Sequence, residues 1–295
     1  MSFFKSSYLL SHTINGDDYK IIMEGQYLNL MKDILKNAPP RSSRNGNVLS
    51  KFGAHLECDL ADGFPLLTSK KMFWRGIVEE LCWFLRGSTD VRELRSKRVH
   101  IWDGNSEDRN WDAGPVYGFQ WRHFGEEYRG CGIEYSGIDQ ITNVIQQLKC
   151  SPSSRRIVLS AWNPLQQAEM CLPPCHVMYQ FYVESDGRVS VQMYQRSSDV
   201  FLGLPFNIAS TALLLKLICH YVEMKPGRVI IQIGDAHIYE EHILACREQL
   251  EAKQHPLPSV KLMRKNNDLL WNVRAEEIVL LDYVCENTIR APMKA

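Results

Sequence analysis

The apolar positions along this chain predict five helices. Residues 26–36, QYLNLMKDILK, place their apolar side chains on one helical face, and residues 139–149 and 239–253 follow the same amphipathic pattern. Residues 76–85, GIVEELCWFL, and 208–224 are apolar on nearly every side. Such all-apolar segments are typical of helices that are buried in a core.

Strands are expected in apolar segments that are bounded by turn residues. They are 48–60, 156–162, 176–184, 188–195 and 277–284. Ser185-Asp186-Gly187 is a good hairpin turn, whereas residues 37–47, NAPPRSSRNGN, read as a loop rich in breakers. This order of elements predicts one α/β (α+β) domain over residues 25–295, with a mixed sheet flanked by helices. The polar, irregular residues 1–24 are expected to form an N-terminal extension.

The composition, 45% hydrophobic and 23% charged, is that of a globular protein and excludes a disordered chain. A length of 295 residues is enough to bury a sizeable core. Lys plus Arg number 34 and Asp plus Glu number 34, so the formal net charge is zero. A neutral chain lacks the global positive field of a nucleic-acid-binding protein, although a local cationic pocket remains open.

Nine cysteines at irregular spacings do not fit a secreted disulfide framework, which is denser and usually even in number. The first twenty residues lack an apolar signal-peptide core. The most apolar stretch, residues 211–219, is too short to cross a bilayer and contains Lys216. We therefore expect an intracellular, cytoplasmic protein with free thiols and no membrane segment. No cysteine or histidine spacing matches a zinc or haem motif, so no metal is expected.

Cys175 is the strongest candidate for chemistry. Pro173 and Pro174 stiffen the approach to the strand that begins at His176, which fixes the thiol at the start of that strand. Such a cysteine is suited to nucleophilic attack if a nearby cation lowers its pKa, and is otherwise an inert core thiol. Arg196 is a candidate for that cation and also for a phosphate ligand.

Arginines outside the predicted helices would allow an anion pocket in a neutral protein. They are Arg41 and Arg44 in the early loop, Arg155 and Arg156 before a strand, and Arg196. Ser197, Ser198 and Asp199 follow directly and add hydroxyls and a carboxylate at one sheet edge. The alternative is a set of solvated turns with a local Arg–Asp ion pair.

Three further polar residues could contact a nucleotide. Two glutamates are also notable, because they lie on an apolar helix. Asn207 is either a helix N-cap or a reader of a ring edge with adjacent C=O and N–H groups. His237 and Tyr239 alternate, so a strand would place both on one side, where they could bind a sugar hydroxyl. Glu79 and Glu80 lie on a helix predicted to be buried, where a carboxylate needs a partner or a function.

Motifs along nearly the whole chain resemble those of the folate-dependent, cysteine-nucleophile thymidylate synthases. In order they are FPLLTSKK, EELCWFLRGST, HIWD, GPVYGFQWRHFG, GIDQI, SSRRIVLSAWNP, LPPCHVMYQFYV, MYQRSSDVFLGLPFNIAS, GDAHIYEEH and IRAPM. They run from about Tyr27 to the C-terminus, and their ordered coincidence is highly specific. The resemblance implies the thymidylate synthase fold, and a catalytic domain, for residues 25–295.

The resemblance also implies roles for the matching residues. Those implied to be catalytic are Cys175, Glu80, Arg196, Tyr117, Asn207 and Asp199. Those implied to bind dUMP are Arg41 or Arg44, Arg155, Arg156, Arg196, Ser197, Ser198, Asp199, Asn207, His237 and Tyr239. Those implied to line the folate site are Asp199, Trp102, Leu172, Gly203, Phe206 and Lys294, the last of them in a tail that closes over folate in the family.

The implied reaction is the reductive methylation of dUMP to dTMP, with 5,10-methylenetetrahydrofolate as co-substrate, dihydrofolate as second product and no metal. Cys175 forms a covalent adduct at C6 of dUMP, which makes C5 nucleophilic. A homodimer is implied too, with Arg155 and Arg156 reaching the other subunit's site. The family's early phosphate motif is not matched residue for residue, so Arg41 and Arg44 both remain candidates.

Two alternatives belong to different functional classes. A dUMP or dCMP hydroxymethylase of the same superfamily would share Cys175 but add water, not hydride, to the exocyclic methylene. A dCMP-specific enzyme carries aspartate at the position of Asn207, so Asn207 favours uracil. The other alternative is a non-enzymatic RNA-binding protein, against which the neutral charge and the lack of a basic run argue. Nucleic-acid and membrane partners are therefore not expected.

Overall fold

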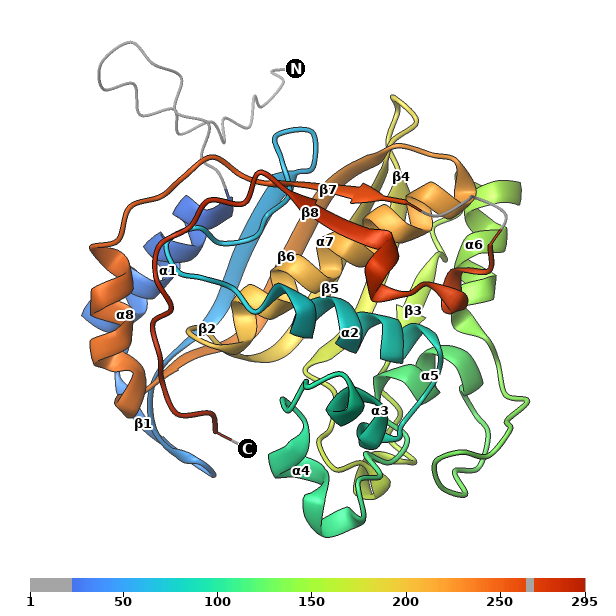
Figure 1. Ribbon diagram of the computed structural model, residues 1–295, viewed down its shortest axis with the longest axis horizontal. Helices are drawn as coiled ribbons and strands as arrows, with labels where there is room; N and C mark the ends of the chain where they lie inside the picture. Colours follow the sequence, from blue (N-terminus) through green and yellow to red (C-terminus); the bar gives the residue numbers. More distant parts are fainter. Residues whose placement is uncertain (1–22, 264–267, 295) are drawn as a thin grey trace, which may run out of the picture.

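The computed structural model describes residues 23–263 and 268–294, so nearly all of the predicted N-terminal extension lies outside the described residues. Its centre is a six-stranded sheet in the order β1-β2-β6-β5-β4-β3 (Figure 1). Neighbouring strands are antiparallel except β5 and β6, which are parallel, so the predicted mixed sheet is confirmed. The strands are β1 (Pro40–Ser43), β2 (Gly46–Asp59), β3 (Val158–Ser160), β4 (His176–Val183), β5 (Val189–Asp199) and β6 (Pro226–Tyr239).

Helices cover one face of this sheet and its two sides (Figure 1). The central helix α7 (Gly203–Val222) contacts β5, β6 and α2 (Trp74–Leu85). The other helices are α1 (Met23–Asn37), α3 (Val91–Ser96), α4 (Asp103–Ser106), α5 (Tyr117–His123), α6 (Gln140–Cys150) and α8 (Ile243–Leu250). Short 3₁₀ turns are η1 (Glu107–Arg109), η2 (Gln167–Glu169), η3 (Glu240–His242), η4 (Leu270–Asn272) and η5 (Ala275–Glu277). A second sheet pairs β7 (Ser259–Leu262) with β8 (Ile278–Leu281). The strand β8 lies within the predicted late strand, residues 277–284, whereas β7 was not predicted.

The helix α7 is long and apolar enough to cross a membrane by length and composition, but 72% of its most apolar stretch is buried inside the protein.

The start of α7 corrects the prediction that Asn207 could be a helix N-cap. The helix begins at Gly203, five residues before the predicted start, and Pro205 is tolerated because it lies in the first turn. Asn207 is therefore inside the helix and is not its N-cap.

Two of the segments that differ from the sequence prediction lie in the main sheet. Residues 40–43, expected to be loop, form β1 and pair with the first residues of β2. All four residues of β1 are exposed, so no apolar alternation marks them as a strand. The strand β6 was not predicted beyond its last residues, although it is paired on both sides at the centre of the sheet.

A bend in β5 and β6 turns the polar motifs toward one end of the sheet. In β6 the alternation of buried positions changes phase at Ile233 and Gly234, which are both buried. In β5 it changes at Arg196 and Ser197, which are both partly exposed. A Cβ atom at Gly234 would lie 2.7 Å from the Arg196 carbonyl oxygen, so the close approach at the bend requires glycine. Beyond the bend, Arg196 begins the polar end of β5.

Candidate active site

The ends of three central strands gather the polar motifs. Because β5 and β6 are parallel, Ser197 pairs with Asp235 and Asp199 pairs with His237. The strand β4 runs antiparallel to β5, so its first residues, directly after Cys175, reach the same end. The β1–β2 hairpin and the N-terminal end of α7 complete this region. Motifs that are far apart in the sequence thus meet as one site.

Cys175 lies between a phenol and a guanidinium. Its backbone N–H donates to the Tyr117 hydroxyl at 2.7 Å. Arg196 donates to the carbonyl oxygens of Pro173 and Pro174 at 2.8 and 2.9 Å, which holds its Nη2 3.9 Å from the Cys175 sulfur. Burial raises the pKa of the Cys175 thiol, and the charge of Arg196 and a hydrogen bond with Tyr117 offset part of that rise. Formation of the thiolate therefore depends on Arg196.

Glu80 is the glutamate of α2 that belongs to the site. Its Oε1 accepts a hydrogen bond from Trp102 Nε1 at 2.7 Å. Burial raises the pKa of Glu80 to about 7, and the Trp102 hydrogen bond opposes that rise. A carboxyl group with a pKa near neutrality can both give and take a proton at physiological pH, which suits general acid–base chemistry.

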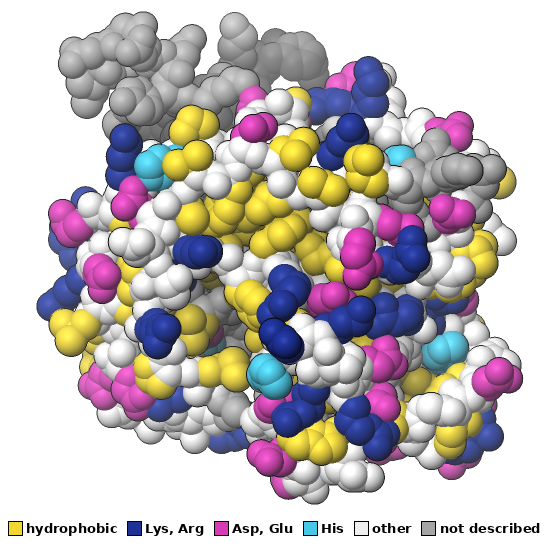
Figure 2. Space-filling view, viewed as in Figure 1, with side chains coloured by type: hydrophobic (Ala, Val, Ile, Leu, Met, Phe, Trp, Pro, Cys, Tyr) yellow, Lys and Arg dark blue, Asp and Glu magenta, His cyan; other side chains and the backbone are white. Residues whose placement is uncertain are grey.

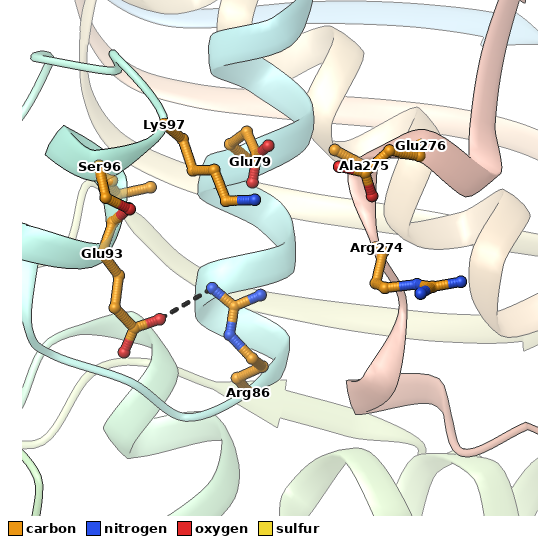
Figure 3. A pocket seen from close by; sticks show the side chains of 9 residues that line it. Glu79, Arg86, Glu93, Ser96, Lys97, Arg274, Ala275 and Glu276 are labelled. Atoms are coloured by element: carbon orange, nitrogen blue, oxygen red, sulfur yellow. Dashed lines mark hydrogen bonds and ion pairs between the residues drawn. The ribbon is translucent and has the colours of Figure 1, made fainter.

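Glu79, the preceding residue, lines a different feature. It lies at the bottom of a polar groove of about 590 Å³ between α3 and η5 (Figure 3). The groove is also lined by Arg86 and Glu93, which form an ion pair at 2.9 Å, and by Lys97. None of its lining residues is among the predicted site residues. The two adjacent glutamates are therefore separated by the helix, and only Glu80 joins the site.

Two buried residues that the sequence analysis did not single out orient Asn207. Gln195, 1% exposed, donates from Nε2 to Asn207 Oδ1 at 2.7 Å. His176 forms a hydrogen bond with Asn207 and places Nδ1 3.0 Å from the Tyr179 hydroxyl. Burial lowers the pKa of His176 to about 4, so this ring is neutral at physiological pH. The only sequence signal for either residue is that it directly adjoins Cys175 or Arg196.

Asp199 is held at the turn between β5 and α7. Its Oδ1 accepts backbone N–H bonds from Phe201 and Leu202 at 3.0 and 3.2 Å. A Cβ atom at Gly203 would lie 3.7 Å from the Cβ of Asp199 and 3.8 Å from Asn207 Oδ1. Gly203 therefore lies directly beside Asp199 and Asn207.

His237 and Tyr239 project from the same side of β6, as their alternation predicts. Their rings lie 5.2 Å apart, and His237 Nδ1 lies 3.3 Å from Asp235 Oδ1. Asp235 also forms an ion pair with Arg41 at 3.2 Å. Burial raises the pKa of Tyr239, and the positive charge of Arg44 lowers it, which puts Arg44 near this ring. Arg41 is thus already paired, whereas Arg44 lies beside a predicted nucleotide ligand.

The remaining predicted residues of this region differ in burial. Trp102 is buried, and Leu172 and Phe206 are half-buried against the core. Ser197 is half-buried on the same side as Asp199, but Ser198 is 2% exposed and pairs with buried Ala236. Its hydroxyl has no hydrogen-bond partner within the described part of the chain. Ser198 therefore faces the opposite side of β5, contrary to the expectation that it binds dUMP, because neighbouring strand residues alternate.

Arg155 and Arg156 are not brought to the site of their own subunit. Both are exposed and precede β3, the edge strand next to β4. Val158 pairs with Gln180, five residues along β4 from Cys175. At about 3.3 Å per residue, the backbone of these arginines lies about 16 Å or more from that of Cys175. Among the described residues, no group of three or more His, Cys, Asp or Glu side chains could hold a metal ion.

Comparison with known proteins gives a consistent result. The family model described as thymidylate synthase matches residues 25–295. The thymidylate synthase of Herpesvirus ateles is 46% identical over 284 residues, which cover 92% of this chain and 97% of that protein. The bifunctional dihydrofolate reductase-thymidylate synthases of Zea mays and Glycine max are 46% and 49% identical over 83% and 82% of this chain. This chain spans about half the length of those bifunctional relatives.

Proposed function

Because the chain belongs to the thymidylate synthase family, we propose that it converts dUMP to dTMP with 5,10-methylenetetrahydrofolate as donor of the one-carbon unit and the hydride. Dihydrofolate is the second product. The observation that carries this proposal is the thiol of Cys175 beside Arg196, which share one site with Glu80, Asn207 and Tyr117. The protein acts in a reducing, intracellular compartment, since the nucleophile must remain a free thiol.

The nucleotide is bound through its phosphate, ribose and base. Arg196 and Arg44 bind the phosphate, and His237 and Tyr239 bind the 3′-hydroxyl of the ribose. Asn207 reads the uracil edge, because its amide offers one donor to O4 and one acceptor to N3–H. The hydrogen bond from Gln195 to Asn207 Oδ1 supports this orientation of the amide.

The chemistry begins with addition of the Cys175 thiolate to C6 of dUMP. The electron pair moves through C5 to O4. The resulting enolate attacks the methylene carbon of the co-substrate from C5, after the bond between that carbon and N10 breaks and leaves an iminium ion at N5. Loss of the C5 proton and cleavage of the bond to tetrahydrofolate leave an exocyclic methylene. Hydride from tetrahydrofolate reduces that methylene, and expulsion of the thiolate releases dTMP and dihydrofolate.

Protons in this sequence move through Glu80 and the hydroxyl of Tyr117. Glu80, whose pKa is about 7, gives and takes protons at O4 through ordered water. Tyr117 lies against Cys175 and takes part in removal of the C5 proton. His176 is neutral at physiological pH and acts through its hydrogen bond to Asn207. Trp102, Leu172, Gly203, Phe206 and Asp199 form the folate site on the adjoining side.

Replacing Asn207 by aspartate is expected to move the preference from dUMP toward dCMP. An ionised carboxylate only accepts hydrogen bonds, so it repels O4 of uracil and accepts from the amino group of cytosine. We expect the ratio of kcat/KM for the two nucleotides to change by about 10²-fold or more. Steady-state kinetics with both nucleotides measures this, and an unchanged ratio would count against Asn207 as the reader of the base.

The homodimer is part of the same proposal. The sheet face without helices carries exposed Val158, Tyr182 and Tyr194, which offer an interface. Arg155 and Arg156 lie too far from their own Cys175 to serve it, so they would bind the phosphate in the partner's site. A closed two-fold dimer would then contain two shared sites.

Mixing two defective variants tests this sharing. Cys175→Ser and the double variant Arg155→Ala, Arg156→Ala should each show little activity at low dUMP. Random exchange of subunits should restore about a quarter of wild-type activity, because half of the dimers then hold one intact site of two. Sedimentation of an active monomer, or mixing without recovery, would contradict shared sites.

The function itself is tested by product analysis. Purified protein with dUMP and methylenetetrahydrofolate should form dTMP and dihydrofolate in equal amounts, followed by chromatography and by the absorbance of dihydrofolate. Formation of 5-hydroxymethyl-dUMP with tetrahydrofolate, and no dihydrofolate, would instead establish the hydroxymethylase.

A further inference from the structure

His242, at the end of η3, is a fully buried histidine that the steps above do not use. The rings of Phe201 and Tyr239 pack around it at centroid distances of 5.6 and 5.3 Å. Its Nε2 lies 2.8 Å from the carbonyl oxygen of Pro292 in the C-terminal tail. Its Nδ1 lies 3.5 Å from Asp199 Oδ1. The imidazole therefore stands between the tail and a predicted folate ligand.

Both ring nitrogens of His242 face oxygen atoms that can only accept hydrogen bonds. A neutral imidazole has one N–H group. With that N–H on Nε2, bonded to Pro292, the lone pair of Nδ1 points at the carboxylate of Asp199. Nδ1 is then a buried nitrogen that lacks a hydrogen-bond partner within the described residues, which is unfavourable. The imidazolium, with an N–H on each nitrogen, satisfies both oxygens.

We propose that His242 is a positioning residue of the folate site, whose imidazolium form ties the C-terminal tail at Pro292 to the carboxylate of Asp199. The inference rests on the proposed function for the role of Asp199, but the bridge itself is a property of the fold. It keeps Asp199 ionised and fixed while the tail lies over the site. Loss of the second proton removes the Asp199 arm of the bridge and loosens this arrangement.

The charged groups around His242 agree with a protonated ring. Glu241 precedes it and forms an ion pair with Lys294, which fixes the tail at a second point. Burial lowers the pKa of His242, but the hydrogen bond and charge of Asp199 outweigh burial, helped by the Pro292 carbonyl and by Glu241, so the pKa is raised.

Three further titratable groups face this region. Lys70, in the segment between β2 and α2, and Cys246, on α8, interact electrostatically with Asp199. Burial lowers the pKa of Lys70 to about 8, and burial raises the pKa of Cys246 to about 12. Burial also raises the pKa of Tyr239, so this phenol stays neutral. Near neutral pH, His242 is thus the ring beside Asp199 that changes charge.

The pH dependence has a definite sign. Because the folded pKa is raised, the bridge is complete below about pH 6.5, the ordinary value for histidine, and is lost as the pH rises through the folded pKa. The KM for methylenetetrahydrofolate should therefore increase with pH over that window. The affinity for dUMP should not follow it, because the proposed function places Asp199 in the folate site, and His242 otherwise contacts only the ring of Tyr239 among the proposed nucleotide ligands.

The protonation state can be measured without activity. Two-bond ¹H–¹⁵N spectra of ¹⁵N-histidine-labelled wild-type protein, with His242 assigned through the backbone, should show both ring nitrogens protonated at pH 6.5. At higher pH the signals should change to those of the Nε2–H tautomer, together with shifts of tail residues. A ring that stays neutral from pH 6 to 8 would overturn the proposal, whether or not the protein makes dTMP.

His242→Gln provides the kinetic test, with His255→Gln as matched control. Glutamine can donate to the Pro292 carbonyl but cannot carry charge, so the KM for methylenetetrahydrofolate should rise about 10-fold and lose its pH dependence, the scale of one charge-assisted hydrogen bond. The dUMP affinity should stay within about twofold. His255 also bonds a carboxylate, at 2.6 Å from Glu286, but outside the site, so its variant should keep the wild-type profile. A His242→Gln profile identical to wild type, or equal losses of dUMP and folate affinity, would overturn the proposal.

Discussion

Replacing Cys175 by serine should abolish formation of dTMP while dUMP still binds. Serine preserves the size of the side chain and the backbone N–H bond to Tyr117, so the nucleotide pocket should keep its shape. A hydroxyl is a far weaker acid than a thiol, and Arg196 at 3.9 Å cannot make it an alkoxide near neutral pH. We expect turnover to fall by on the order of 10⁴- to 10⁶-fold, the scale on which a covalent nucleophile contributes.

Nine cysteines make the choice of control important. Cys171 is partly buried four residues away, and burial raises its pKa to about 11, so it is a poor nucleophile. Cys171→Ser should therefore keep near wild-type turnover. For both variants, equilibrium dialysis with labelled dUMP measures nucleotide binding, and the absorbance of dihydrofolate measures turnover. Substantial turnover by Cys175→Ser would remove the nucleophile assignment.

Replacing Glu80 by glutamine should lower kcat by about 10²- to 10⁴-fold, the usual contribution of a general acid or base. Glutamine still accepts the hydrogen bond from Trp102 but cannot transfer a proton. The pH profile of the wild-type enzyme should show a limb near pH 7, which reports Glu80, and this limb should be absent in the variant.

The adjacent Glu79→Gln is the matched control for Glu80→Gln. Both substitutions are isosteric and lie on the same helix, but Glu79 faces the separate polar groove (Figure 3). Its variant should keep kcat within about twofold of wild type, as for most changes away from a site. Equal losses in the two variants would mean that damage to α2, and not loss of a proton carrier, explains the effect.

The surface of the protein shows why net charge said little about the site. Figure 2 shows Lys and Arg side chains on the visible face, several of them gathered near its middle, with Asp and Glu side chains among and around them. The cation that acts on Cys175 is instead held internally by two backbone carbonyls. A neutral composition is therefore compatible with a strongly directed local charge.

Features with a local signature could be predicted from the sequence. The prolines before Cys175 and the alternation of His237 and Tyr239 identified the strand ends that carry them. The apolar run of α7 identified a core helix, although Gly203 and Pro205 concealed its first turn. In contrast, β1 is exposed along its whole length, so no apolar pattern reports it.

Residues whose role depends on contacts across the fold could not be predicted in the same way. Gln195 orients Asn207 only because the start of α7 returns to the end of β5. His242, Asp199 and Pro292 lie far apart in the sequence, and only the fold brings them into contact. For Ser198 the sequence predicted a contact that the fold does not provide. Its place in a polar motif suggested a dUMP ligand, but the alternation of side chains along β5 turns it into the buried side.

The central claim is a covalent bond between the Cys175 sulfur and C6 of the nucleotide. A dUMP analogue with fluorine at C5 has no C5 proton to lose, so the reaction should stop after transfer of the methylene. Denaturing mass spectrometry of protein incubated with this analogue and methylenetetrahydrofolate should then show one adduct with the mass of both ligands, on the peptide that contains Cys175. The absence of an adduct, or its appearance on another cysteine, would contradict the account.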